Sequence, residues 1–158
     1  MTREELLREA IRLSRENVDS GRGGPFGAVV AKNGEVVATG VNVVTSANDP
    51  TAHAEVTAIR AACAALRTFS LAGCEIFASC EPCPMCLGAI YWARLDAVYF
   101  AAGHADAAEA GFDDSFLYQE IPLPISERSL PTHHVTDLRD EANAAFQAWR
   151  ANALKTPY

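Results

Sequence analysis

The sequence predicts an α/β protein in which helices pack on a sheet that contains parallel strands. Segments with helical periodicity alternate with short runs rich in β-branched residues, in the order α-β-β-α-β-α-β over residues 2–102. Strands that are separated by a helix pair in parallel, so the later strands should lie side by side in one direction. The length of 158 residues suits a single domain, and we take 1–158 as one unit.

The first half of the chain predicts a helix, a hairpin and a second helix. Residues 2–17 form the first helix, with Thr2 and Glu5 at capping-box spacing. Residues 26–44 form a β-hairpin around Asn33-Gly34, a dipeptide typical of a type I′ turn. Residues 52–66 then have the apolar spacing of a helix that follows the turn Asn48-Asp49-Pro50.

The second half begins with strong signals and ends with weaker ones. A strand is expected over 74–79, a helix over 84–94 and a strand over 95–102. Pro84 stands where the first turn of a helix tolerates proline. The remaining expectations are a short helix within 103–116, an irregular connection over 119–131, a short last strand at 133–135 and a final helix over 139–154.

Composition and charge argue against several classes of function. The formal charge of -7 argues against a nucleic-acid partner, because such proteins usually carry a basic surface. No apolar run is long enough to cross a membrane, and the N-terminus is charged from its third residue, unlike a signal peptide. Five cysteines, three of them clustered, indicate reduced thiols with metal or redox chemistry in a cytoplasmic protein.

Two short motifs predict a zinc site. The stretch SCEPCPMC holds Cys83 and Cys86 about one helical turn apart, and TAHAE holds His53. The 30 residues from His53 to Cys83 span a helix, a turn and a strand, so both helix starts should lie on neighbouring parallel strands, at one sheet edge. Sulfur-rich ligation favours zinc, and three protein ligands plus water is the catalytic arrangement.

Cys80 decides between a catalytic and a structural metal site. As a fourth ligand it would close the site, and the protein would be a zinc-stabilised binding module without enzymatic activity. Cys80 belongs, however, to the strand before a turn that Pro82 and Pro84 stiffen, so it would have to fold back to reach the ion. We therefore predict that Cys80 is a buried apolar side chain, as free cysteines often are.

Glu55 lies two residues after His53 and is not needed as a ligand. A carboxylate beside a metal-bound water can accept its proton and return it to a leaving group. The alternative is a first-turn glutamate that interacts with the helix dipole. Beside His53 and the cysteine pair, we expect Glu55 to be the proton shuttle.

The pattern H-x-E followed by P-C-x-x-C, here HAE at 53–55 and PCPMC at 82–86, is typical of zinc nucleobase deaminases. The chain thus resembles the cytidine deaminase-like superfamily. Within it, the chain is similar to the bacterial guanine deaminases through DPTAHAEVTAIR, SCEPCPMCLGAIYWAR, AEAGFDDSF, AAFQAWR and a terminal tyrosine. The resemblance implies a three-layer α/β/α fold with a mixed sheet of about five strands, one Zn²⁺ per chain, and hydrolysis of guanine to xanthine and ammonia.

The same resemblance assigns residues around the substrate. Asp114 would contact the purine and assist proton transfer, with Asp113 as the alternative, and Asn42 would be the amide that reads the base. The backbone N–H of Ala54, at a helix start, could hold a substrate oxygen. A flat base needs apolar faces to stack on, and three aromatic side chains are expected to supply them: Phe26, Trp92 and Phe112.

Finally, the resemblance implies a homodimer that exchanges C-terminal segments, with residues 119–158 as the exchanged arm and Tyr158 closing the partner's site over a small nucleobase. Other substrates stay open at this point: guanosine, cytosine, an aminotriazine or adenosine in tRNA. The acidic charge and a tail over the pocket disfavour the tRNA substrate.

Overall fold

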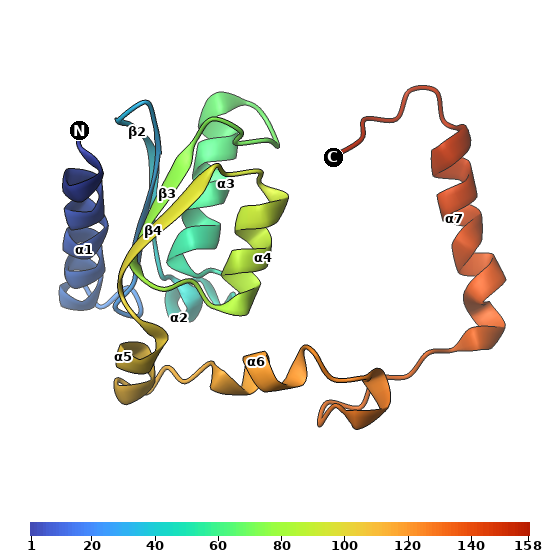
Figure 1. Cartoon of the computed structure of the whole chain (residues 1–158). Coiled ribbons are helices and arrows are strands. Elements are labelled where there is room, and N and C mark those ends of the chain that lie inside the picture. The colour runs from blue at the N-terminus through green and yellow to red at the C-terminus, as the bar shows by residue number, and fades with distance from the viewer. The chain divides into compact units, whose positions relative to one another are not determined.

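The computed structural model describes all residues of the chain, 1–158 (Figure 1). The chain divides into two compact units, Met1–Asp114 and Ser115–Tyr158.

The first unit contains one sheet and five helices. Its elements in chain order are α1 (Arg3–Asp19), β1 (Gly27–Lys32), β2 (Glu35–Val41), α2 (Val44–Ala47), α3 (Ala54–Leu66), β3 (Glu75–Cys80), α4 (Pro84–Trp92), β4 (Ala97–Ala102) and α5 (His104–Glu109).

The sheet is mixed and its strand order is β2-β1-β3-β4. β1 pairs antiparallel with both β2 and β3, whereas β3 and β4 are parallel. The sequence predicted that the strands preceding α3 and α4 are neighbours, and this was wrong. β1 lies between these two strands, β2 and β3. They still point the same way, so both helices begin at the same edge of the sheet.

Helices cover both faces of the sheet, and this confirms the predicted three layers. α1 lies on one face, and α3 and α4 lie on the other (Figure 1). β1 is buried on both sides: Val29 and Ala31 pack in the cluster with Leu6 of α1, while Ala28 and Val30 pack in the cluster with α3. Alternation of side chains along the central strand thus joins the two halves of the core.

The local turn and cap signals are confirmed. Thr2 caps α1 in a reciprocal capping box with Glu5. Asn33 and Gly34 both have positive φ, 52° and 79°, as the type I′ turn of the hairpin requires. The short helix α2 was not predicted, and it ends at Asn48 in the left-handed conformation. α3 begins at Ala54, two residues later than expected, because His53 has extended backbone angles.

The second unit contains helices only. Its elements are α6 (Ser115–Glu120), the 3₁₀ turns η1 (Ile125–Glu127) and η2 (Thr136–Leu138), and α7 (Arg139–Ala151). Residues 133–135, where a last strand was predicted, form none, and the sheet has four strands. A strand needs a hydrogen-bonding partner, and this unit contains no sheet that could provide one. No helix in the structure has the length and apolar character needed to span a membrane.

Candidate active site

The two predicted ligand segments occupy equivalent places in their helices. His53 is the N-cap residue of α3 and Cys83 is the N-cap residue of α4, both with extended backbone angles. Neither side chain caps its own helix, so both are available to point elsewhere. Cys86 follows within the first turn of α4, on a helix that Pro84 begins.

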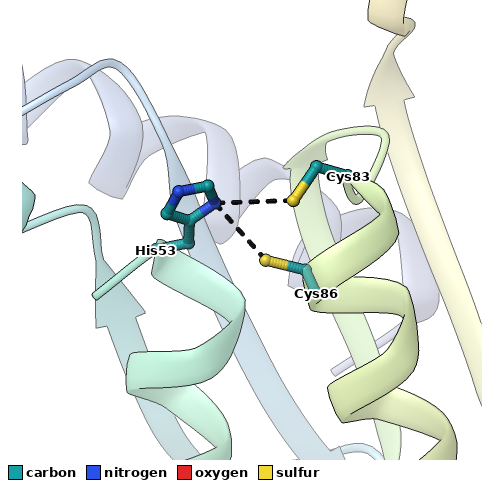
Figure 2. A group of neighbouring side chains, drawn as sticks. All are labelled: His53, Cys83 and Cys86. Carbon is teal, nitrogen blue, oxygen red and sulfur yellow. Dashed lines mark hydrogen bonds between the residues drawn. The ribbon is translucent and has the colours of Figure 1, made fainter. Parts of the chain in front are cut away.

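These three side chains converge at the sheet edge (Figure 2). The Nδ1 atom of His53 lies 3.6 Å from the Sγ atom of Cys83 and 3.5 Å from that of Cys86. A tetrahedral zinc ion with ordinary Zn–S and Zn–N bonds separates sulfur from nitrogen by about 3.5 Å. Both sulfur–nitrogen distances therefore match a zinc ion, and the His/Cys/Cys group is the expected metal site.

The two cysteines differ in how readily they ionise. The pKa of Cys83 is lowered to about 4, because Cys86 donates a hydrogen bond to its sulfur and His53 lies beside it. The pKa of Cys86 is raised correspondingly, through that same hydrogen bond and through burial. The pKa of His53 is raised mainly by its hydrogen bond with Cys83. Zinc binding would therefore displace the proton that Cys86 retains.

Glu55 is buried beside this group. Its side chain is on the first turn of α3, the residue is only 7% exposed, and its Oε2 atom lies 3.4 Å from the Sγ atom of Cys86. Burial raises the pKa of Glu55, which makes it a better proton acceptor than an ordinary glutamate. A first-turn glutamate that only interacted with the helix dipole would be expected at the surface.

The close approach of α3 to the sheet depends on Gly40 in β2. A Cβ atom at this position would lie 2.4 Å from the carbonyl oxygen of Ala54 and 2.3 Å from the backbone nitrogen of Ala58. No side chain fits there, so α3 packs directly against the strand. This contact holds the start of α3, and with it His53 and Glu55, in place at the sheet edge.

Cys80 lies outside the metal-binding group. It ends β3, is buried, and directs its sulfur to the carbonyl oxygen of Gly103 at 3.6 Å. Burial raises its pKa to about 11, so this thiol stays protonated at neutral pH. The group that could hold a metal consists of His53, Cys83 and Cys86.

Asn42, the expected base-reading amide, is buried at the end of β2 with a fixed orientation. Its Oδ1 atom accepts hydrogen bonds from the backbone N–H groups of Val44 and Gly24, at 3.2 Å and 3.4 Å. The neighbouring Val43 donates its N–H to the carbonyl oxygen of Ala52, next to His53. The amide is thus held close to the metal segment.

Asn17 supports the backbone of Asn42 and was not predicted as a site residue. Its Nδ2 donates to the carbonyl oxygens of Asn42 and Gly24, both at 2.8 Å, and the residue is fully buried. The available signal was its position: Asn17 continues the apolar stripe of Leu6, Ala10 and Leu13 along α1. A polar side chain on such a stripe indicates a buried hydrogen bond.

Two of the three expected pocket aromatics meet. The rings of Phe26 and Phe112 pack edge to face, with centroids 5.0 Å apart. Both line an apolar cavity of about 340 Å³, together with Cys80 and Ala102 at the strand ends and Ile11 of α1. The lining of this cavity does not include the metal group, Glu55 or Asn42. Asp114, two residues after Phe112, is half-buried, whereas Asp113 is exposed. Ala54 is the first residue of α3, where backbone N–H groups have no acceptor within the helix.

Trp92 and Tyr158 are placed differently. Trp92 ends α4 and is 65% exposed, with the guanidinium of Arg94 over its ring at 5.7 Å. It lies six residues beyond Cys86, about 9 Å further along the helix. Tyr158 is the last residue of the second unit and is 76% exposed.

Comparison with known proteins agrees with this geometry. Residues 1–102 match the family described as the cytidine and deoxycytidylate deaminase zinc-binding region. The chain is 57% identical to guanine deaminase from Bacillus subtilis over 158 residues, which is all of both chains. The X-ray structure of the Bacillus subtilis enzyme superposes with a TM-score of 0.96 over 100% of this chain and 99% of that one.

Two further relatives share only part of the chain. The structure of guanine deaminase from Nitrosomonas europaea matches 69% of this chain and 63% of its own, with 35% identity and a TM-score of 0.66. A tRNA-specific adenosine deaminase from Aquifex aeolicus is 40% identical over 102 residues, 65% of this chain and 67% of its own.

Proposed function

Because this chain belongs to the zinc-binding cytidine and deoxycytidylate deaminase family, we propose that it hydrolyses guanine to xanthine and ammonia. The observation that carries the proposal is the buried carboxylate of Glu55 beside a three-donor metal group. The relative that matches over the full chain, including the second unit, carries the choice of guanine.

His53, Cys83 and Cys86 would hold one zinc ion, which supplies the lowered pKa of a bound water, to about 7. Glu55 takes a proton from the attacking water and passes it to the ring nitrogen next to the carbon that bears the exocyclic amine. The water oxygen bonds to that carbon. Glu55 then moves the second proton from the new hydroxyl to the amine, the C–N bond breaks, and ammonia leaves xanthine behind.

Two polar side chains offer the hydrogen-bond acceptor and donor that guanine requires. A carboxylate at Asp114 can accept hydrogen bonds from the adjacent N1–H and 2-amino groups. Asn42 has its side-chain oxygen engaged by Gly24 and Val44, so its NH₂ group is the part left to bind substrate. It would therefore donate to an acceptor atom on the base. Phe26, Phe112 and the backbone N–H of Ala54 complete the pocket in this proposal.

The second unit argues for a base rather than tRNA. The matched tRNA-specific deaminase covers 65% of this chain, whereas the guanine deaminase covers all of it. The net charge of -7 also disfavours a polyanionic substrate.

We further propose that Ser115–Tyr158, which includes the predicted arm 119–158, is exchanged between two copies of the chain. The unit has no buried residue, and its final helix α7 leaves Phe146 and Trp149 65% and 42% exposed. An amphipathic helix of this kind requires a covering surface. A partner copy would cover it, and there Tyr158, and Trp92 on α4, would help to close the pocket.

The proposed metal site requires Cys83 and Cys86 as reduced thiols, and all five cysteines lack disulfides. We therefore place the protein in a reducing compartment, the cytoplasm.

A panel of bases tests the proposal directly. Zinc-loaded protein is assayed for ammonia release from guanine, guanosine, cytosine, adenine and an aminotriazine. Guanine should have the highest kcat/KM, by at least tenfold. Turnover of another member of the panel with none of guanine would overturn the assignment while leaving the deaminase chemistry intact.

A further inference from the structure

Glu81 is the one charged side chain between Cys80 and Cys86, and the proposed mechanism does not use it. Its Oε2 atom accepts two hydrogen bonds, both from His104. The backbone N–H of His104 donates at 3.1 Å, and the Nδ1 atom of its imidazole lies at 2.9 Å. A carboxylate that holds both a backbone and a side-chain group of one residue constrains its position more than a single contact would.

Two more contacts join the same two segments. The N–H of Glu81 donates to the carbonyl oxygen of Ala102 at 2.8 Å, and the thiol of Cys80 donates to that of Gly103. Cys80 and Ala102 are also the last paired residues of the parallel ladder between β3 and β4. The turn that leads to Cys83 is therefore fastened to the start of α5 immediately beyond the sheet.

The chain beyond His104 carries two substrate-site candidates. Gly103 donates its N–H to Asp106 at the start of α5, and Phe112 donates its own to Ala107 near the end. After Gly111, with φ of 96°, the chain reaches Phe112 and then Asp114. These hydrogen bonds lie within one segment, residues 103–114, and they fix its backbone from the first turn of α5 to Phe112. Its attachment at His104 consequently influences where Phe112 and Asp114 lie.

We infer that Glu81 is a positioning residue. Through His104, it holds segment 103–114 at a fixed distance from the turn that leads to Cys83. The inference rests on the proposed function only in taking the ligand to be a nucleobase. It assigns to Glu81 an effect on base binding, and none on metal retention or on the proton transfers at Glu55.

The geometry predicts that variants of the full-length, zinc-loaded protein weaken base binding to different degrees. Glu81→Ala removes both hydrogen bonds to His104. Of these two bonds, His104→Ala removes the one from the imidazole and keeps the one from the backbone N–H. Glu81→Gln keeps an acceptor for the backbone N–H and should restore part of the loss. Glu109→Gln, the same chemical change at an exposed position at the end of α5, is the matched control.

The measurements are zinc per chain, kcat and KM for guanine, and the Kd of the product xanthine by calorimetry. Loss of a charge-assisted pair should raise KM and Kd about tenfold in Glu81→Ala and about threefold in His104→Ala. Glu81→Gln should fall between Glu81→Ala and the unchanged protein. All variants should keep one zinc, kcat should change less than KM, and Glu109→Gln should match the unchanged protein.

Three results would overturn the inference. One is loss of zinc from Glu81→Ala and His104→Ala, which would assign the pair to metal retention. Another is a fall in kcat with KM and Kd unchanged. The third is unchanged base binding in His104→Ala, an exposed substitution that should fold even if Glu81→Ala does not. If the unchanged protein deaminates a different base, the proposed substrate fails, and the series is measured with that base and its product.

Discussion

The two units of this chain differ in what they do with apolar side chains. Every buried core residue lies in Met1–Asp114, between α1 on one face of the sheet and α3 and α4 on the other. Ser115–Tyr158 has helices but no buried residue. The metal group, Glu55 and Asn42 all belong to the first unit, and each is held by elements of that unit. The candidate site therefore lies in the unit that builds its own core, while the other unit exposes its apolar side chains.

The strongest test of this division is Glu55→Gln in the first unit. Without a carboxylate to move protons, kcat should fall about 10⁴-fold, the upper range for general acid–base catalysis. Zinc should remain at one per chain, because Glu55 is not in the His/Cys/Cys group. Ammonia release and metal analysis measure both. Substantial activity in the zinc-replete variant would remove the proton shuttle from the mechanism.

The thermal stability of Glu55→Gln is the control that tests whether the variant still folds. Burial raises the pKa of Glu55, so the folded state binds a proton more tightly than the unfolded state. Stability of the metal-free protein should therefore fall as the pH rises from the ordinary glutamate value through the raised one. Glu55→Gln removes this slope. At pH 8 the metal-free variant should unfold at a Tm no lower than the unchanged protein, which excludes misfolding as the cause of lost activity.

Removal of the second unit should have the next largest effect. A chain that ends at Asp114 keeps the whole core and the metal group, so it should fold and bind one zinc. If the arm completes the pocket, kcat/KM should drop about 100-fold, the scale seen when substrate positioning is lost. Ammonia release measures kcat/KM, and circular dichroism, zinc analysis and sedimentation report folding, metal content and association. Loss of zinc from the shortened chain would contradict the division between the units.

Local signals predicted most of the first unit, and long-range pairing accounts for what they missed. The capping box of Thr2 and Glu5 and the turn at Asn33-Gly34 depend on a few adjacent residues. The insertion of β1 between β2 and β3 depends on strands far apart in the chain, and alternation of side chains carries no information about which strands pair.

The same contrast holds at the site. His53, Glu55 and the cysteine pair were predictable because zinc chemistry limits residue type and spacing. The partners of the supporting residues Asn17 and His104 were not, because they lie in remote segments; the stripe position of Asn17 indicates only that its side chain is buried. In the second unit, a strand at 133–135 was expected from its composition, yet no partner strand exists in that unit.

A smaller effect is expected from the apolar face of α7. Replacing Phe146 and Trp149 with serine should weaken self-association about 100-fold, as loss of two aromatic contacts at an interface would. The metal content should not change, because both residues lie in the second unit. Sedimentation equilibrium over a concentration series measures the Kd. Gln147→Ser, an exposed polar change on the same helix, is the control. An unaltered Kd would mean that α7 is not part of the interface.

The smallest effect is expected at Cys80, where burial and metal binding can be separated within one motif. Its thiol contacts the carbonyl oxygen of Gly103, and a serine hydroxyl can make the same hydrogen bond. Cys80→Ser should therefore keep one zinc and a kcat/KM within about threefold, and lower the free energy of unfolding by about 1 kcal/mol, since the hydroxyl is costlier to bury. Cys83→Ser, three residues away, should lose the zinc. If Cys80→Ser lost it too, the site would have four protein ligands, no position for water, and no reason for Glu55 to be buried beside it.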